Sequence, residues 1–189
     1  MLQRDTIIEA LQRLGRKAAA RQLKAEIAIY GGTVMMLAYN ARPGTKDVDA
    51  IFRPREEIKA LAEEVAHEMG IDSGWLNDDV RLFAANAGGA GHIDFVELAD
   101  VPGLVITRPA AKYLLAMKAR AARLLQGSDF DDLVLLLRHA RVRTIDEVEG
   151  INERYFPGEP LDERQRAFVE TALARAHEPP PSPESPRSR

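Results

Sequence analysis

The sequence contains no cysteine, which excludes disulfide bonds and thiolate metal sites. It also lacks any apolar run that approaches the roughly 20 residues a membrane-spanning helix needs. The first residues carry charges throughout, including Arg4, Asp5 and Glu9, and so do not form the apolar core of a signal peptide. From these absences we expect a cytoplasmic protein with no membrane segment.

An excess of basic charge is also missing. The formal net charge of −3 argues against a uniformly basic nucleic-acid binder. Basic residues nevertheless gather in two stretches, residues 1–24 and 108–123, which could form local faces for a polyanion. Either stretch could equally be the solvated face of a helix.

The order of the expected elements indicates two parts and a tail. Apolar periodicity, β-branched runs and turn residues predict helices to about Lys24 and over residues 33–40 and 54–69, and strands over 26–30, 46–52, 80–85, 92–98 and 104–109. Four further helices are expected over residues 110–125, 129–140, 144–156 and 161–177.

These elements predict an α+β protein. Residues 1–107 would form the core, a mixed sheet with flanking helices, and residues 108–177 a C-terminal helical bundle. Residues 178–189 are rich in proline and serine, a composition typical of a disordered tail.

Two short motifs are not explained by core packing. Gly31 and Gly32 end an apolar run, and Asp47 and Asp49 lie two residues apart in the next apolar run. Side chains alternate across a strand, so both carboxylates should project from the same face. Carboxylates this close repel each other, which raises the free energy of keeping both ionised.

A divalent cation would remove that repulsion. Hard oxygen ligands suit Mg²⁺, which often takes one or two protein carboxylates and completes its shell with water and substrate phosphates. Gly31 and Gly32, between a strand and a helix, would let phosphate approach backbone amides, and the Thr33 hydroxyl could add a contact. The pattern predicts a nucleoside-triphosphate site facing Mg²⁺. The alternative is an aspartate-rich turn, with Asp47 capping the backbone and Asp49 exposed.

This arrangement resembles the polymerase-β-like nucleotidyltransferase superfamily, in which Gly-Gly or Gly-Ser precedes Asp-x-Asp on the next strand. The stretch RPGTKDVD, from Arg42 to Asp49, is similar to the Arg-x-x-Thr-x-Asp-x-Asp form found in AbiE-type and MenT-type nucleotidyltransferase toxins. The resemblance implies that Asp47 and Asp49 hold metal ions and that Gly31 and Gly32 contact the triphosphate.

The resemblance continues into the helical part. The family's LLAxK stretch is matched by LLAMK at residues 114–118, and its Asp-x-x-Asp-Leu stretch by residues 129–133. It implies that Lys118 stabilises phosphate charge in the transition state and that Asp132 takes part in catalysis. Asp129 and Asp132 lie three apart on a predicted helix and should share one face. Without the resemblance, Lys118 would be interpreted as a solvent-facing lysine.

Two further residues have a less defined role. Many members of the superfamily use a third carboxylate on a later strand, and Asp94, in HIDFVEL, has the setting to complete the metal site or act as a base. Arg42 would contact phosphate or brace Asp49, with an ordinary surface ion pair as the alternative.

The resemblance implies a Mg²⁺-dependent enzyme that moves a nucleoside monophosphate from an NTP to an acceptor hydroxyl. In the toxin branch the acceptor would be the 3′ end of tRNA, charging would be blocked, and a separate antitoxin would be the partner. The two basic stretches would then contact RNA phosphates. The alternatives are a nucleotidyltransferase acting on a protein or a small molecule, and an inactive nucleotide-binding module of the same fold.

Overall fold

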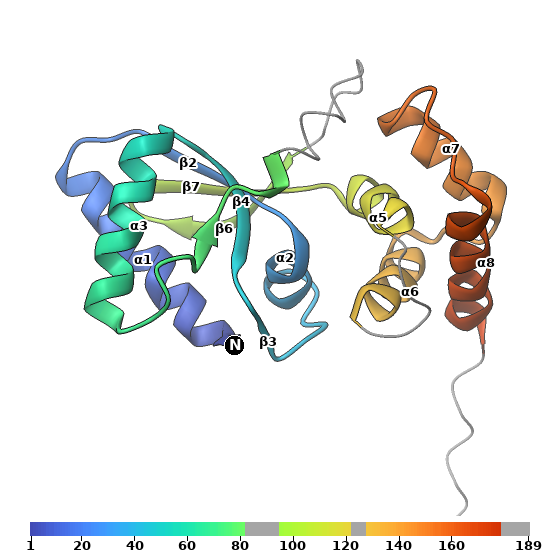
Figure 1. The fold of residues 1–189 in the computed structure, drawn as a ribbon, viewed down its shortest axis with the longest axis horizontal. Coiled ribbons are helices and arrows are strands. Elements are labelled where there is room, and N and C mark those ends of the chain that lie inside the picture. Colours follow the sequence, from blue (N-terminus) through green and yellow to red (C-terminus); the bar gives the residue numbers. More distant parts are fainter. Residues whose placement is uncertain (82–94, 122–127, 179–189) are drawn as a thin grey trace, which may run out of the picture.

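The computed structural model describes residues 1–81, 95–121 and 128–178. Within these ranges the protein has seven helices and a mixed five-stranded sheet, which confirms the α+β expectation (Figure 1). None of the described helices combines the length and the apolarity that crossing a membrane requires.

The central sheet has the strand order β5-β4-β2-β7-β6. Its strands are β2 (Ala25–Ile29), β4 (Val48–Arg53), β5 (Leu76–Asn77), β6 (Phe95–Val101) and β7 (Leu104–Pro109). Strand β2 pairs antiparallel with β4 and parallel with β7. Because β2 is the central strand, the turn that follows its last residue lies in the middle of the row of strand ends.

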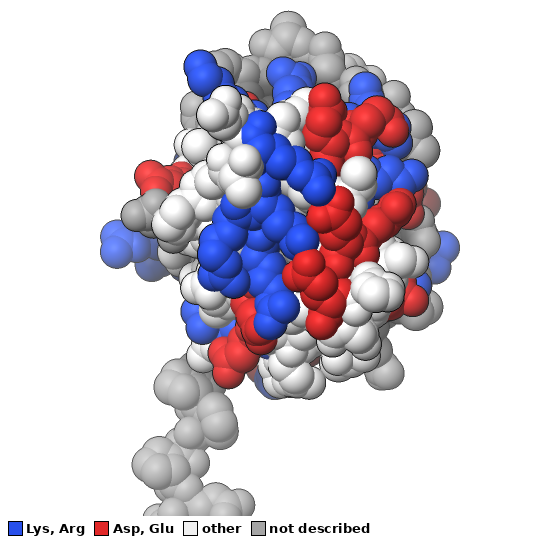
Figure 2. Space-filling view, turned by 90° about the vertical axis from the view of Figure 1, so that its left-hand side faces the viewer, with Lys and Arg blue, Asp and Glu red and all other residues white. Residues whose placement is uncertain are grey.

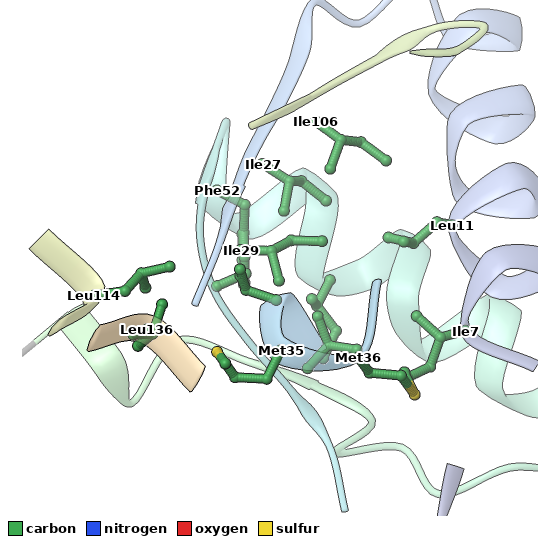
Figure 3. Close-up of a cluster of buried hydrophobic side chains, with 14 of the residues drawn as sticks. Ile7, Leu11, Ile27, Ile29, Met35, Met36, Phe52, Ile106, Leu114 and Leu136 are labelled. Carbon is green, nitrogen blue, oxygen red and sulfur yellow. The ribbon is translucent and has the colours of Figure 1, made fainter. Parts of the chain in front are cut away.

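Helices cover one face of this sheet. The helices α1 (Arg4–Ala20) and α3 (Arg55–Met69) pack side by side against that face (Figure 1). Figure 3 shows Ile7 and Leu11 of α1 facing Ile27, Ile29 and Ile106 of the sheet, all of them fully buried or nearly so. Buried and less buried residues alternate along β2 and β4, and this alternation is the sequence pattern that predicts strands.

The intervening residues of the same strands point to the other face, where Ala28 of β2 and Ile51 of β4 pack against a cluster that includes Tyr113 of the helical part. This part consists of α5 (Ala111–Arg120), α6 (Ser128–Ala140), α7 (Ile145–Tyr155) and α8 (Glu163–His177). Capping boxes fix the first turns of α7 and α8, at Thr144 with Glu147 and at Asp162 with Gln165.

The two parts share one hydrophobic core. The short helix α2 (Gly31–Leu37) lies between them, and its Met35 is buried with Leu114 of α5 and Leu136 of α6 (Figure 3). A two-stranded sheet of β1 (Leu2–Gln3) and β3 (Gly44–Thr45) flanks it. The helical part is therefore docked directly on the elements that follow β2.

Some boundaries differ from the sequence expectation. The first helix ends at Ala20 rather than near Lys24, because the chain turns at Gln22, whose φ is 53°, and Leu23 N–H bonds back to the Ala18 carbonyl. Val80 and Arg81 are helical, so the prediction of a strand from Val80 was wrong at these two residues. The rest of that strand, Asp94 and residues 179–189 of the expected tail lie outside the described residues.

Candidate active site

The glycine turn and the aspartate pair meet at the end of β2. The backbone N–H of Tyr30 donates to the Asp49 carbonyl at 2.8 Å, which holds the turn against β4. Gly31 has φ +60°, and a Cβ built on it would lie 2.6 Å from Asp49 Oδ2. Glycine suits this position because its φ is positive and because the Asp49 carboxylate lies where a side chain would begin.

The next two residues are fixed by neighbouring segments. A Cβ on Gly32 would lie 2.8 Å from Arg42 Nη1 and 2.9 Å from Thr45 Oγ1. The buried Thr33 hydroxyl donates to the Asp47 carbonyl at 3.1 Å. Gly32 and Thr33 therefore join α2 to the segment that leads into β4, and their contact with phosphate stays a prediction.

The aspartate pair lies on the face opposite the helix-covered core. Val48 between the two is fully buried, whereas Asp47 and Asp49 are half-buried. Burial raises the pKa of the Asp49 carboxyl, and the negative charges of Asp47 and Asp79 raise it further, whereas a hydrogen bond from Asn77 lowers it. Ionising this carboxyl is therefore costly until a cation approaches it.

The donor set fits a Mg²⁺ ion bound through a pair of carboxylates. Asp47 and Asp49 supply hard oxygen ligands from one strand end, and water or phosphate would complete the shell. In the part of the chain that the structure describes, no group of three or more histidine, aspartate or glutamate side chains is arranged to hold a metal. The predicted third carboxylate, Asp94, lies outside that part.

The helical part brings Lys118 to the same place. Its Nζ lies 2.5 Å from Asp129 Oδ1 and 2.9 Å from Asp132 Oδ2, so both acids share one face of α6 as their spacing predicts. Asp132 is only 2% exposed and also accepts a hydrogen bond from Arg42. Arg42 Nη2 donates to the Ser128 carbonyl as well, at 3.3 Å, so its guanidinium contacts α6 and not Asp49.

A cleft of about 440 Å³ joins these groups. Asp49 lines it from β4, Gly31 from the first residue of α2, and Lys118 from α5. The remaining lining residues come mostly from the helical part: Asp79, Val80, Leu114, Met117, Arg120, Ala121, Phe156, Glu159 and Gln165. Residues from three separated sequence motifs therefore face one cavity whose volume falls in the range of small-molecule sites.

The sequence did not predict that several of these lining residues belong to the site. Arg120 donates to the backbone carbonyl of Glu159 at 2.8 Å, pairs with the Glu159 carboxylate and lies 4.6 Å from the Phe156 ring centroid. Asp79 was missed with the two-residue strand β5. Its only signal was the polar run Asn77-Asp78-Asp79, which carries no periodicity.

The basic stretch at the N-terminus lies away from this cleft. Figure 2 shows a band of basic side chains beside a band of acidic ones on the side of the molecule where α1 and α3 lie. Lys17 Nζ is 2.6 Å from Glu68 Oε1, and Arg21 Nη2 is 2.6 Å from Glu64 Oε1. Much of the positive charge of α1 is therefore balanced by α3.

The second basic stretch is also largely paired. Besides Lys118 and Arg120, Arg108 packs over the ring of Tyr39 at 5.3 Å from its centroid. Lys112 is exposed, and Arg123 lies outside the described residues. The described part of residues 108–123 therefore offers less free positive charge than its sequence suggests.

Comparison with family models, with curated proteins and with solved structures gives no match for this chain. A functional assignment therefore has to come from the chemistry of the cleft and from the motifs that line it.

Proposed function

We propose that this protein is a Mg²⁺-dependent nucleotidyltransferase, which moves a nucleoside monophosphate from an NTP to an acceptor hydroxyl. The observation that carries the proposal is the meeting of Gly31, Asp49 and Lys118 in one cleft. They belong to three separate motifs, since Asp49 follows Gly31 by 18 residues and Lys118 follows it by 87. The same three motifs carry the resemblance to polymerase-β-like nucleotidyltransferases.

The proposed reaction uses the charges of the cleft. The acceptor oxygen forms a bond to the α-phosphorus, and the bond from that phosphorus to the β-phosphate oxygen breaks, so pyrophosphate leaves with the bonding electron pair. The proton of the acceptor hydroxyl passes to water or to a cleft carboxylate. Bound Mg²⁺ would neutralise triphosphate charge and lower the pKa of the acceptor hydroxyl.

The side chains of the protein position the reactants. Asp47 and Asp49 would hold the cation, and the Lys118 ammonium, on the opposite wall, would stabilise the negative charge that develops on the phosphates. Catalysis of this kind consists mainly of alignment and charge neutralisation. The shared hydrophobic core, which includes Leu114 and Leu136, keeps the two walls of the cleft in register.

For the acceptor, we propose the 3′ end of tRNA, on the resemblance to the toxin branch. Addition of nucleotides there would block aminoacylation and stop translation in the cytoplasm. A cognate antitoxin would then be the protein partner. RNA contacts would involve phosphates and would weaken steeply with salt.

A second acceptor class is favoured by the acids of the cleft. Asp49 and Asp79 line it, whereas Lys118 is paired with Asp129 and Arg120 is paired with Glu159 of the cleft itself. This balance suits a small or protein acceptor that carries positive charge next to its hydroxyl. Binding of such an acceptor would not need the basic stretches.

The test incubates the protein with Mg²⁺ and each α-³²P-labelled NTP, with total tRNA, a mixture of cytosolic proteins or a panel of hydroxylated amines. Asp49→Asn removes one carboxylate charge in the cleft. Glu64→Gln removes one on α3, away from the cleft, and serves as the matched control. We expect transfer by the wild type and Glu64→Gln, and a loss of at least about 100-fold in Asp49→Asn, more than outer-shell changes cause.

The label identifies the acceptor. Label on tRNA that falls steeply between about 50 and 200 mM salt supports the tRNA proposal. Label on protein or amine supports the second class. NTP binding without transfer to any acceptor, unchanged in Asp49→Asn, contradicts the enzymatic proposal and identifies a nucleotide-binding module.

A further inference from the structure

We propose that Arg42 is a positioning residue, which holds the buried Asp132 carboxylate and thereby leaves the Lys118 ammonium available to phosphate in the cleft. The proposed role in transfer rests on the nucleotidyltransferase function above. The arrangement itself rests only on the contacts of these three side chains. It assigns to Arg42 a role exerted through Asp132 rather than direct contact with phosphate or with Asp49. It also makes Asp132, which is buried and does not line the cleft, a partner of the two cations rather than a residue that contacts the reacting atoms.

Asp132 lies at the centre of this arrangement. It is buried on α6 and receives two cations from distant parts of the sequence, Arg42 from the segment between α2 and β3 and Lys118 from α5. Burying a carboxylate is costly unless cations and hydrogen bonds compensate for the lost water. With Asp129, which also pairs with Lys118, the group has two positive and two negative charges.

The environment of Arg42 fixes its side chain in place. Its Nη1 passes so close to Gly32 that a Cβ there would lie 2.8 Å away. Its Nη2 donates to both Asp132 and the carbonyl of Ser128. A single guanidinium nitrogen of Arg42 therefore contacts α6 twice, at a side-chain carboxylate and at a backbone carbonyl. Arg42 does not belong to the cleft lining, whereas Lys118 does.

Loss of Arg42 would change what Lys118 can do. Lys118 would then be the cation left to neutralise Asp132, and a buried carboxylate competes strongly for it. An ammonium held by that carboxylate is less free to follow the phosphate charge in the transition state. We therefore expect Arg42→Gln to lower kcat more than it changes KM.

The key test is whether a second substitution restores activity. We expect kcat of Arg42→Gln to fall about 10- to 100-fold, as for loss of outer-shell partners. In Arg42→Gln/Asp132→Asn the competing carboxylate is gone, and kcat should recover several-fold above that of Arg42→Gln. If Arg42 only joined the two parts of the protein, removal of its partner would restore nothing, and that result would overturn the proposal.

The control is Arg166→Gln. Arg166 of α8 also joins two helices, through Glu149 of α7, and it pairs with Glu170 within α8, but it is exposed and does not line the cleft. Its kcat and KM should match the wild type. Chemical denaturation of every variant ensures that kinetics are compared on folded protein. Arg42→Met, which also removes the charge, replaces Arg42→Gln if the latter does not fold.

A second readout does not need transfer activity. In nucleotide-free protein, the acetylation rate of Lys118 by an activated acetyl ester is followed by mass spectrometry. A tightly paired ammonium reacts more slowly, so Arg42→Gln should lower the rate about threefold, and the double variant should restore it. Equal rates in wild type and Arg42→Gln would overturn the proposal even if transfer is observed. If Arg42→Gln lowers the acetylation rate as expected but the wild type transfers no nucleotide, the proposed function is refuted. The role of Arg42 in keeping Lys118 free of Asp132 would then still stand.

Discussion

Lysine and arginine side chains meet carboxylates in two regions of the molecule. Between α1 and α3 the pairs are open to water, with the Arg21 side chain 48% and that of Glu64 40% exposed. At the junction of core and helical part, the side chains of Asp132, Lys118 and Arg42 are only 3%, 14% and 18% exposed. The number of charges is similar, but their environment differs.

The difference decides what each region contributes. Exposed pairs gain little because water already solvates both partners and salt screens them. A buried carboxylate cannot lose its cations without a large free-energy cost. Charge density alone, which is what the sequence shows, therefore says little about function. The region beside the cleft is the one where charge is buried.

The largest expected effect is on stability. Asp132→Asn leaves Arg42 and Lys118 without their shared carboxylate, so the free energy of unfolding should fall by about 3 kcal/mol, the low end for a broken buried pair. Glu64→Gln, an equivalent chemical change on α3, should lower it only slightly, because water solvates both partners of an exposed pair. Urea titration measures both. Equal losses of unfolding free energy in the two variants would mean that the burial of a charge does not decide how much it contributes to stability.

A smaller effect of opposite sign is expected at the aspartate pair. Because burial and the charge of Asp47 raise the pKa of Asp49, ionisation of this carboxyl destabilises the fold at neutral pH. Discounted for partial solvent exposure, Asp49→Asn should raise Tm in metal-free buffer by about 2 °C.

Added Mg²⁺ provides the complementary measurement, by differential scanning fluorimetry. It should raise the Tm of the wild type, because binding to the folded state stabilises it. Asp49→Asn should show no such rise. A rise of equal size in both proteins would place the cation elsewhere.

Tyr113 extends the comparison to a buried polar group without a partner. Its hydroxyl has no hydrogen-bond partner among the described residues, and burial raises the pKa of the side chain to about 12. Tyr113→Phe removes only that hydroxyl, so stability should rise by up to about 1 kcal/mol. Thermal unfolding checks this, and a clear loss would show that the hydroxyl has a partner in solution.

The smallest effect concerns the pH dependence of the exposed region. Hydrogen bonds from Arg21 and Lys17 lower the pKa of Glu64 below its ordinary 4.5. Its contribution is therefore fully present above that value and is lost as the pH falls through the lowered pKa. The small Tm difference between wild type and Glu64→Gln should shrink as the pH is lowered below 4.5, and it should vanish once Glu64 is protonated. A difference that persists there would point to packing and not charge.

Much of the fold could be predicted from the sequence because its signals are local. Alternation places Asp47 and Asp49 on one face of a strand, and helical spacing places Asp129 and Asp132 together. These predictions needed only the residues within one element. The two-residue strand β5 had no such pattern, since it forms only by pairing with β4, and Asp79 was missed with it.

The partners of Arg42 could not be predicted for a different reason. Arg42 and Asp132 lie 90 residues apart, and they meet only because α6 docks against the segment that follows α2. The sequence left three possibilities for Arg42, and none of them was this carboxylate. Such contacts depend on how the parts pack and not on any local pattern.

The most direct measurement is calorimetric titration of each non-hydrolysable NTP analogue into the protein with and without Mg²⁺. If the cleft is a nucleotidyltransferase site, at least one analogue should bind in the presence of Mg²⁺. Both Lys118→Gln and Asp49→Asn should weaken that binding at least about tenfold, whereas Glu64→Gln should leave it unchanged. Absence of binding by every analogue, or equal affinity in all four proteins, would contradict the assignment of this cleft.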